Sequence, residues 1–409
     1  MSGAAAMPEP AGPHVFLVAG EESGDRLGAA LIAALRRAGG TGVRFSGIGG
    51  DQMAAAGVPS LFPLGDLAIM GFAAIPARLP TILARIREAA DAVIAARPDV
   101  LVIIDSPEFT HRVARRVRAR APGIPIVDYV CPSVWAWRPG RARAMRPYVD
   151  RVLALLPFEP EAMRRLGGPP CSFVGHPLAE AVGRLRPNAE EAKRRLSDPP
   201  LILVLPGSRS GEIRRMAPVF GAALARVAAE AGPLDIVVPA VARLAATVRA
   251  AVASWPVPAR VVVDPAEKDL AFRTARAALT KSGTSTLELA VAGVPMVAAY
   301  KVPLIEELIA RLLIKTGSVI LANLVLGENV VPEFLQRDCT PGKLAAALLP
   351  LLRDSPERRR QAAALARLDT VMDIGQAAPS ERAAAAVLEI GAGFNQAARE
   401  TMASRPVTA

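Results

Sequence analysis

The feature that most constrains the fold is an alternation of short apolar runs with longer amphipathic patterns, repeated along most of the chain. Short apolar runs bounded by turn residues are typical of strands that are buried on both faces of a parallel sheet. Because helical patterns lie between the runs, we expect a doubly wound α/β domain in the first half of the chain. Its strand candidates are residues 15–19, 100–104, 124–130 and 152–155.

A second set of apolar runs follows a polar interruption. These runs are residues 201–205, 235–238, 260–263, 277–280 and 296–299. A chain of 409 residues also exceeds what one hydrophobic core normally serves. The sequence therefore predicts two Rossmann-like domains, with the ligand site in the cleft between the C-terminal ends of their strands.

The same patterns give the expected domain boundaries. From Pro341 onward the pattern is purely helical, so the last helices could pack back on the first domain. We expect a disordered leader at 1–12, an N-terminal domain at 13–183, a linker at 184–200, a C-terminal domain at 201–372, a C-terminal helix at 373–395 and a tail at 396–409.

Charge and cysteine content narrow the class of protein. The chain has 49 Lys and Arg against 38 Asp and Glu, and its net charge of +11 favours anionic ligands or surfaces. An arginine-rich surface without a specific ligand would give the same charge. Aromatic residues are only 4% and no RNA-binding aromatic motif occurs, so we expect no nucleic acid partner. Three scattered cysteines and the lack of a signal peptide favour the cytoplasm.

Two loops with carboxylates follow strands of the first predicted domain. The first is GEESGD, whose three carboxylates would repel a pyrophosphate, so sugar hydroxyls are the better ligand. Capping of the next helix by Ser23 and Asp25 is the alternative. The second loop begins with Asp105, directly after a predicted strand. A carboxylate there could take a proton from a substrate hydroxyl, which makes Asp105 the candidate general base, unless it only caps the following turn.

A tryptophan pair lies in the motif PSVWAWR. Trp135 and Trp137 are at positions i and i+2, so in an extended segment both rings would face the same way. Such a pair could form a platform for an acyl chain or a sugar face. Arg138 and Arg141 follow and offer donors to a phosphate. The alternative is a packed loop followed by a solvated basic helix.

Two loops of the second predicted domain have the composition of a phosphate site. The motif LPGSR supplies a glycine, the hydroxyl of Ser208 and the guanidinium of Arg209. The motif KSGTSTLE opens a helix, so its amides could hold phosphate while Glu288 accepts the ribose hydroxyls. A capping box between Ser285 and Glu288 would explain the same residues.

The sequence LAIMGFAAIPARLPTIL at residues 67–83 is apolar but too interrupted to span a bilayer. We interpret it as a contact with the membrane surface that also forms an acyl groove, with Met70, Phe72 and Ile75 as contact residues. An ordinary buried helix is the alternative.

Taken in order, several of these motifs resemble one known family. GEESGD, DSPEF, PSVWAWR, LPGSR, SGTSTLE and the pair Asn323-Leu324 are similar to motifs of the lipid-A-disaccharide synthases. The resemblance implies an inverting GT-B glycosyltransferase that needs no metal or other cofactor. It also implies the reaction, in which UDP-2,3-diacylglucosamine and 2,3-diacylglucosamine 1-phosphate give a β-1',6-linked disaccharide phosphate and UDP.

The resemblance also assigns residues. It carries over Glu21, Ser23 and Asp25 in the first loop, Asp105 as base, Arg209 on the diphosphate, Glu288 on the ribose and Asn323 near the UDP. Ser106 and Glu108 depart from the family pattern, so the base stays open between Asp105 and its neighbours. The full expected donor set is Ser208, Arg209, Ser282, Gly283, Thr284, Ser285, Thr286, Glu288 and Asn323. The expected acceptor set is Ser23, Asp25, Trp135, Trp137, Arg138 and Arg141, and the catalytic pair is Asp105 with Glu21.

The expected location is the cytoplasmic face of the inner membrane, where the basic surface would meet anionic lipid. The alternatives are a UDP-N-acetylglucosamine epimerase, another GT-B glycosyltransferase or a non-catalytic nucleotide-sugar-binding protein. The oligomeric state stays open, with a homodimer as one option.

Overall fold

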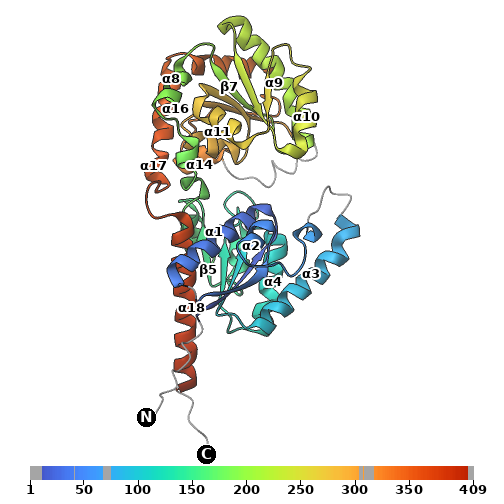
Figure 1. Cartoon of the computed structure of the whole chain (residues 1–409), viewed down its shortest axis with the longest axis vertical. Coiled ribbons are helices and arrows are strands. Elements are labelled where there is room, and N and C mark those ends of the chain that lie inside the picture. Colours follow the sequence, from blue (N-terminus) through green and yellow to red (C-terminus); the bar gives the residue numbers. More distant parts are fainter. Residues whose placement is uncertain (1–11, 41, 68–74, 304–306, 308–316, 404–409) are drawn as a thin grey trace, which may run out of the picture. The chain divides into compact units, whose positions relative to one another are not determined.

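The computed structural model describes residues 12–40, 42–67, 75–303, 307 and 317–403, and they form two compact units (Figure 1). Unit 1 comprises Met1–Pro177 and Ala377–Ala409, and unit 2 comprises Leu178–Gln376. Each unit contains one six-stranded sheet whose neighbouring strands are all parallel. Two parallel sheets covered by helices confirm the predicted α/β class.

The sheet of unit 1 has the strand order β2-β1-β3-β4-β5-β6. Its strands are β1 (His14–Ala19), β2 (Arg44–Ile48), β3 (Val100–Ile104), β4 (Ile126–Tyr129), β5 (Arg151–Ala154) and β6 (Cys171–Phe173). The chain runs from β1 to β2 and then returns to β3 on the other side of β1. In open α/β sheets, ligands bind at the carboxyl ends of the two strands where the order reverses. In unit 1 these strands are β1 and β3, which precede GEESGD and Asp105.

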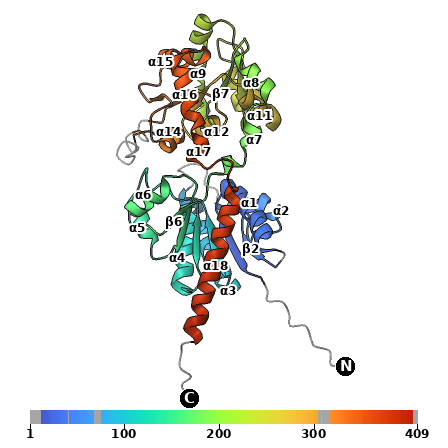
Figure 2. The same cartoon turned by 90° about the vertical axis from the view of Figure 1, so that its left-hand side faces the viewer.

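Helices cover both faces of this sheet. As a consequence, alternate side chains of the strands are buried in two separate cores. One core includes residues of α3 (Ile75–Ala96) and α4 (Pro107–Arg120). The other includes residues of α1 (Glu22–Gly39) and α18 (Pro379–Ala403), which pack side by side (Figure 2). Among the described residues, the other α-helices of unit 1 are α2 (Asp51–Ala55), α5 (Gly140–Met145) and α6 (Glu159–Arg165).

The sheet of unit 2 has the same kind of reversal, with the order β12-β11-β10-β7-β8-β9. Its strands are β7 (Leu201–Leu205), β8 (Asp235–Pro239), β9 (Arg260–Val262), β10 (Ala277–Lys281), β11 (Met296–Tyr300) and β12 (Glu333–Leu335). The order reverses between β7 and β10, and these are the strands that precede LPGSR and SGTSTLE. The helices include α9 (Ser210–Ala231), α10 (Ala245–Val252), α11 (Pro265–Thr274), α12 (Ser285–Val291), α14 (Leu321–Leu326), α15 (Pro341–Leu348), α16 (Pro356–Ala366) and α17 (Leu368–Val371).

Every strand expected from the sequence is present, and three further strands among the described residues were missed. These are β2, β6 and β12, and each lies at an edge of its sheet. β6 and β12 have three residues each, which is too short for a periodic signal, and β2 reads RFSGI with a polar and a glycine position. Edge strands are less buried than central ones, so they lack the continuous apolar run that marked the others.

Residues 184–200, for which we expect a linker, contain α8 (Ala189–Leu196) within unit 2. A capping box starts this helix, since Asn188 Oδ1 accepts from the Glu191 amide and the Glu191 carboxylate accepts from the Asn188 amide. The helix is preceded by α7 (Val182–Leu185). Across the described residues, no helix is both long enough and apolar enough to cross a membrane.

Candidate active site

The turn between β3 and α4 holds Asp105 in an unusual backbone conformation. Asp105 and the next residue, Ser106, have φ angles of 54° and 48°, the left-handed region that non-glycine residues avoid. Such residues cost about 1–3 kcal/mol each and cluster at active sites. The Asp105 amide donates to the Tyr129 carbonyl at 3.1 Å and its carbonyl accepts from Thr110 Oγ1 at 2.7 Å, and both bonds stabilise the turn.

Glycines allow the GEESGD loop to approach this turn closely. A Cβ atom on Gly20 would lie 2.3 Å from the Ser106 Cβ, and one on Gly24 would lie 3.0 Å from the Ile104 carbonyl oxygen. Any larger residue at Gly20 would therefore displace the turn that carries Asp105. The first turn of α1 lies against the end of β3 as a result.

Ser23 links two carboxylates in this contact. Its Oγ lies 2.7 Å from Asp105 Oδ2 and 2.8 Å from Glu21 Oε1, and its single proton can be donated to one of them at a time. Asp105 Oδ1 accepts from the Ser106 amide at 2.8 Å. The arrangement brings Glu21, Ser23 and Asp105 together, with Asp105 half-buried and Glu21 exposed. A carboxylate in this position can accept a proton from a hydroxyl that enters from solvent.

The helix-capping alternative for Ser23 and Asp25 is not what the structure shows, whereas Asp105 does accept from the first amide of its own turn, that of Ser106. Neither α1 nor α4 has a side-chain hydrogen bond at its N-cap. Asp25 instead starts a different helix, α2, because its carboxylate accepts from the amides of Gly50, Gln52 and Met53 at 2.7, 3.0 and 3.0 Å. Asp25 is only 4% exposed and its carboxylate is bonded to these backbone amides, so it has a structural role and does not offer a free carboxylate.

Glu108, the neighbouring candidate base, is surrounded by arginines. Its carboxylate pairs with Arg141 and, at 3.4 Å, with Arg138. Burial alone would raise the pKa of Glu108, but Arg141, Arg138 and Arg112 together lower that pKa below its ordinary value. A lowered pKa makes Glu108 a weaker proton acceptor, so the geometry favours Asp105.

The tryptophan motif forms a turn, so the prediction of an extended segment is wrong. The amides of Ala136 and Trp137 both donate to the Ser133 carbonyl, at 3.0 and 3.1 Å. Trp135 packs edge-to-face on Phe158 and its Nε1 donates to Glu159 Oε1 at 3.1 Å. The two rings therefore have separate partners.

Trp137 is exposed and lies among the arginines of the motif. The guanidinium carbons of Arg138 and Arg141 lie 4.4 and 5.7 Å from the centre of its ring. The same arginines pair with Glu108. Trp137, Arg138 and Arg141 therefore form one cationic and aromatic surface, while Trp135 belongs to the packed base of the loop.

Two buried carboxyls near this region were not found from the sequence. Glu159 accepts from Trp135 and from two backbone amides, and burial raises its pKa to about 7. Burial also raises the pKa of Asp128, whose Oδ2 lies 3.1 Å from His111 Nε2 at ion-pair distance but without hydrogen-bond geometry. His111 Nδ1 contacts the Tyr148 hydroxyl at 3.1 Å. Acidic residues inside a strand or a helix carry no motif, so no sequence signal marks them.

In unit 2, Glu212 organises the loop that follows β7. Its Oε2 accepts from the Ser208 amide at 3.0 Å and its Oε1 accepts from Lys281 Nζ at 3.1 Å. Gly207 has a φ of 138°, and a Cβ atom there would lie 2.6 Å from the Glu212 Cβ, so only glycine fits. Arg209 follows with 82% of its side chain exposed, and its Nη1 lies 3.8 Å from Glu212 Oε1.

A cavity of ≈ 180 Å³ lies between the two loops of unit 2. The predicted donor residues that line it are Ser208, Gly283, Thr284, Ser285 and Glu288. The capping box expected as the alternative does not form, because Thr284 is the N-cap of α12 and makes no side-chain cap bond. In the part of the chain that the structure describes, the Glu288 carboxylate has no hydrogen-bond partner and is available to a ligand.

Other predicted donor residues are buried and bonded within the protein. Asn323 Nδ2 donates to the Val331 carbonyl, and its Oδ1 accepts from the Val330 and Val331 amides, so its amide group is used in holding a turn. Thr286 Oγ1 donates to the Gly283 carbonyl at 2.7 Å. Ser282 Oγ lies 3.4 Å from a carboxylate oxygen of Glu333, a residue that sequence reasoning missed.

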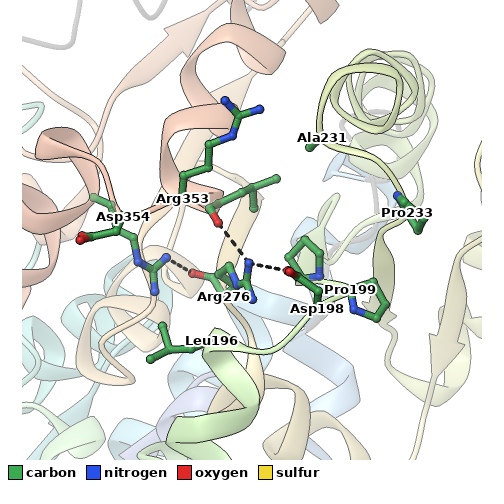
Figure 3. Close-up of a pocket in the computed structure, with 11 residues that line it drawn as sticks. Leu196, Asp198, Pro199, Ala231, Pro233, Arg276, Arg353 and Asp354 are labelled. Carbon is green, nitrogen blue, oxygen red and sulfur yellow. Dashed lines mark hydrogen bonds and ion pairs between the residues drawn. The ribbon is translucent and has the colours of Figure 1, made fainter.

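A larger cavity, of ≈ 1040 Å³, lies at the opposite, amino end of β7 and β10 (Figure 3). Arg276 donates there to Asp198 and to the carbonyls of Arg195 and Leu352, and Arg358 donates to the Arg276 carbonyl. These arginines tie chain segments together. Since ligands of doubly wound sheets bind at the carboxyl ends of the strands, the loops after β7 and β10 stay the candidate site.

The predicted membrane contact falls mostly outside the described residues. Met70 and Phe72 lie there, and of Ile75 only its place at the start of α3 is described. At the two ends of the stretch, Leu67 and Leu83 pack against the core of unit 1.

Two parallel six-stranded α/β sheets are the fold of the GT-B glycosyltransferases and the related epimerases. The fold is similar to that of the UDP-GlcNAc 2-epimerase of Neisseria meningitidis, with a TM-score of 0.62 and 12% identity over 92% of this chain and 100% of that chain. It is also similar to MurG of Acinetobacter baumannii, with a TM-score of 0.57 and 16% identity over 92% and 99% of the two chains.

Sequence comparison narrows the class to one family. A profile described as lipid-A-disaccharide synthetase matches residues 15–390. Lipid-A-disaccharide synthases of Nitrobacter hamburgensis and Bradyrhizobium diazoefficiens are 64% and 63% identical, over 92% and 91% of this chain and 95% of each relative. The chain belongs to the lipid-A-disaccharide synthase family, and it is a glycosyltransferase of lipid A biosynthesis. The resemblance of the motifs is thereby confirmed.

Proposed function

We propose that this chain transfers the sugar of UDP-2,3-diacylglucosamine to the 6-hydroxyl of 2,3-diacylglucosamine 1-phosphate. The strained turn at Asp105 supports this proposal, because it presents a carboxylate that is linked through Ser23 to Glu21. Family membership supplies the substrates. The turn supplies a proton acceptor at the carboxyl end of a central strand, where a substrate hydroxyl would enter.

In this reaction Asp105 removes the proton of the acceptor hydroxyl. The hydroxyl oxygen forms a bond to the anomeric carbon of the donor from the face opposite the diphosphate, so the configuration inverts to β. The bond between that carbon and the diphosphate oxygen breaks with its electron pair, and UDP leaves. Ser23 and Glu21 keep the Asp105 carboxylate in place through the Ser23 hydroxyl.

The donor would bind the cavity of unit 2 through its uridine diphosphate. Glu288 is suited to the ribose hydroxyls, because its carboxylate lines the cavity and is an acceptor. Ser208 and the backbone of the 283–285 loop lie across the same cavity, where amides and hydroxyls can bind phosphate. Arg209 has an exposed guanidinium that can reach the diphosphate.

The acceptor phosphate would bind the surface formed by Trp137, Arg138 and Arg141. Two guanidinium groups provide paired donors for a phosphate, and both pair with the Glu108 carboxylate. Trp137 offers an exposed ring face beside them for an apolar part of the substrate.

Leaving-group stabilisation in this proposal comes from side chains and backbone amides and requires no metal ion. We therefore expect purified enzyme to keep its turnover rate after treatment with a chelator. A strict Mg²⁺ requirement, with activity lost on chelation and restored by added Mg²⁺, would contradict this part of the proposal.

We further propose that the chain lies on the cytoplasmic face of the inner membrane, through residues 67–83 and its net charge of +11. Replacing Met70, Phe72 and Ile75 with Ser should weaken binding to vesicles that contain anionic lipid and leave the melting temperature unchanged. Unfolding of this variant would show that the segment is part of the core, against which the partly buried Leu67 and Leu83 pack.

The experiment that tests the function compares UDP release with acylated and non-acylated donors, each with and without the acylated acceptor phosphate. We expect UDP release and a disaccharide product only when both acylated substrates are present. Epimerised UDP-N-acetylglucosamine would indicate an epimerase, transfer to another acceptor would indicate a different glycosyltransferase, and binding without turnover would indicate a non-catalytic protein.

A further inference from the structure

Lys281 is a cation of the donor cavity to which no motif assigned a role. It is the last residue of β10 and directly precedes the SGTSTLE loop. Its side chain is only 18% exposed, yet it lines the cavity together with Ser208, Gly283 and Glu288. Burying a charged ammonium costs free energy unless it is paired, so the partners of Lys281 indicate which role it can have.

The Glu212 carboxylate fixes the Lys281 ammonium at the junction of three strand ends. Glu212 Oε1 accepts from Lys281 Nζ at 3.1 Å and from the Tyr300 hydroxyl at 3.4 Å, and Oε2 accepts from the Ser208 amide at 3.0 Å. β10 ends at Lys281 and β11 ends at Tyr300, while Ser208 lies in the loop that follows β7. One buried carboxylate therefore sets the position of the ammonium relative to both phosphate loops.

The ammonium keeps binding capacity beyond this ion pair. Of its three N–H donors, Glu212 takes one, and Nζ also lies 4.9 Å from the centre of the Tyr300 ring. A Cβ atom on Gly283 would be 3.2 Å from Nζ, so the backbone of the second loop passes directly beside it. Arg209 approaches the same carboxylate at 3.8 Å. Two cations thus share one carboxylate, which leaves positive charge for an anion between the loops.

We propose that Lys281 contacts the diphosphate of the bound donor and that Glu212 is the positioning residue that holds the ammonium there. This inference rests on the proposed function and adds a residue to its donor site. Negative charge grows on the diphosphate as its bond to the sugar breaks, and a fixed cation in a site of low exposure stabilises that charge more strongly than one in water. Lys281 therefore acts on both binding and departure of UDP.

The test uses the full-length chain and measures binding of UDP and of uridine by calorimetry. The main variant is Lys281→Met with Glu212→Gln, because removing both charges avoids leaving a buried carboxylate unpaired. Lys281→Gln is the second variant, since its amide can still donate to Glu212. Lys343→Met is the matched control, because Lys343 also pairs with a carboxylate, that of Asp338, at an exposed position.

We expect the double variant and Lys281→Gln to bind UDP about 10–100-fold more weakly, the range for a lost hydrogen bond to a charged group. Uridine, which has no phosphate, should bind all variants equally, and turnover should fall at saturating donor. The melting temperature shows which of the two variants folds like the wild type. If such a variant binds UDP with unchanged affinity, Lys281 does not contact the diphosphate. Failure of the unaltered chain to bind either UDP or uridine would overturn the donor site and this inference together.

Discussion

At the scale of single residues, the site depends on side chains whose partners differ from those expected of ordinary caps. Asp105 accepts from Ser23 across two strand ends, and Glu288 makes no capping box. Asp25 is the opposite case, since its carboxylate is used in starting α2. The same residue type therefore has a structural role in one loop and a candidate catalytic role in the next, and only the hydrogen bonds distinguish them.

A substitution of Glu288 tests whether the cavity of unit 2 binds the donor. Glu288→Gln keeps the shape but weakens hydrogen bonds to ribose hydroxyls, because bonds to a charged acceptor are stronger. We expect UDP affinity to fall about tenfold, with an unchanged melting temperature. Glu267→Gln, an exposed first-turn carboxylate in α11, is the control. Normal UDP affinity with a lowered melting temperature would show that Glu288 is only a cap.

The raised pKa of the Glu159 carboxyl predicts that the free energy of unfolding depends on pH. Burial raises its folded pKa to about 7, against an ordinary value of 4.5, so the folded state binds its proton more tightly than the unfolded state. The free energy of unfolding should therefore fall as the pH rises from about 4.5 to 7. A shift of this size corresponds to roughly 3 kcal/mol.

The measurement for Glu159 is urea unfolding of the wild type and of Glu159→Gln at pH 5 and pH 8. Since the variant does not titrate at this position, the wild type should lose more stability than the variant between the two pH values. Parallel pH profiles for the two proteins would show that the folded pKa of Glu159 is not raised.

At the scale of elements, the last helix completes the core of unit 1. In α18, Ala383, Ala384, Val387 and Ile390 are buried in the core that also contains β1 and β3. Its neighbour α1 carries Ser23 in its first turn. Packing of α18 on α1 therefore supports the element that positions the Asp105 contact.

A substitution of Val387 tests the packing of α18 in the core of unit 1. Val387→Asp places an unpaired carboxylate in the core and should lower the free energy of unfolding by about 3–5 kcal/mol. Ala385→Asp, two residues away on the exposed side of α18, should change it by less than about 0.5 kcal/mol. Chemical denaturation of both variants measures the difference. Equal stability of the two variants would contradict the packing of α18 on the sheet.

At the scale of the whole molecule, the sequence predicted the two sheets and directed attention to the loops of the candidate site. The central strands were found because strands buried on both faces read as continuous apolar runs, as in 100–104 and 201–205. The edge strands β2, β6 and β12 were not found, because they are short or interrupted. Motifs located the Asp105 and Glu288 loops.

The partners of the site residues could not be predicted from the sequence. The contact of Ser23 with Asp105 joins residues 82 positions apart, and Lys281 meets Glu212 across 69 positions. The turn at Trp135 also escaped prediction, because a pair at i and i+2 predicts shared orientation only if the segment is extended. Buried carboxyls such as Glu159 lie outside any motif, and their environment exists only in the folded chain.

The turnover rate of Asp105→Asn tests the claim that Asp105 accepts the proton of the attacking hydroxyl. Asparagine keeps the shape, and its single oxygen can still accept from either Ser23 or the Ser106 amide, but it cannot take up a proton. Since general-base catalysis contributes about 10²–10⁴-fold, we expect turnover with both acylated substrates to fall by that factor while UDP affinity and melting temperature stay unchanged. Near-normal turnover of Asp105→Asn would contradict the claim, as would a loss of stability that accounts for the lost rate.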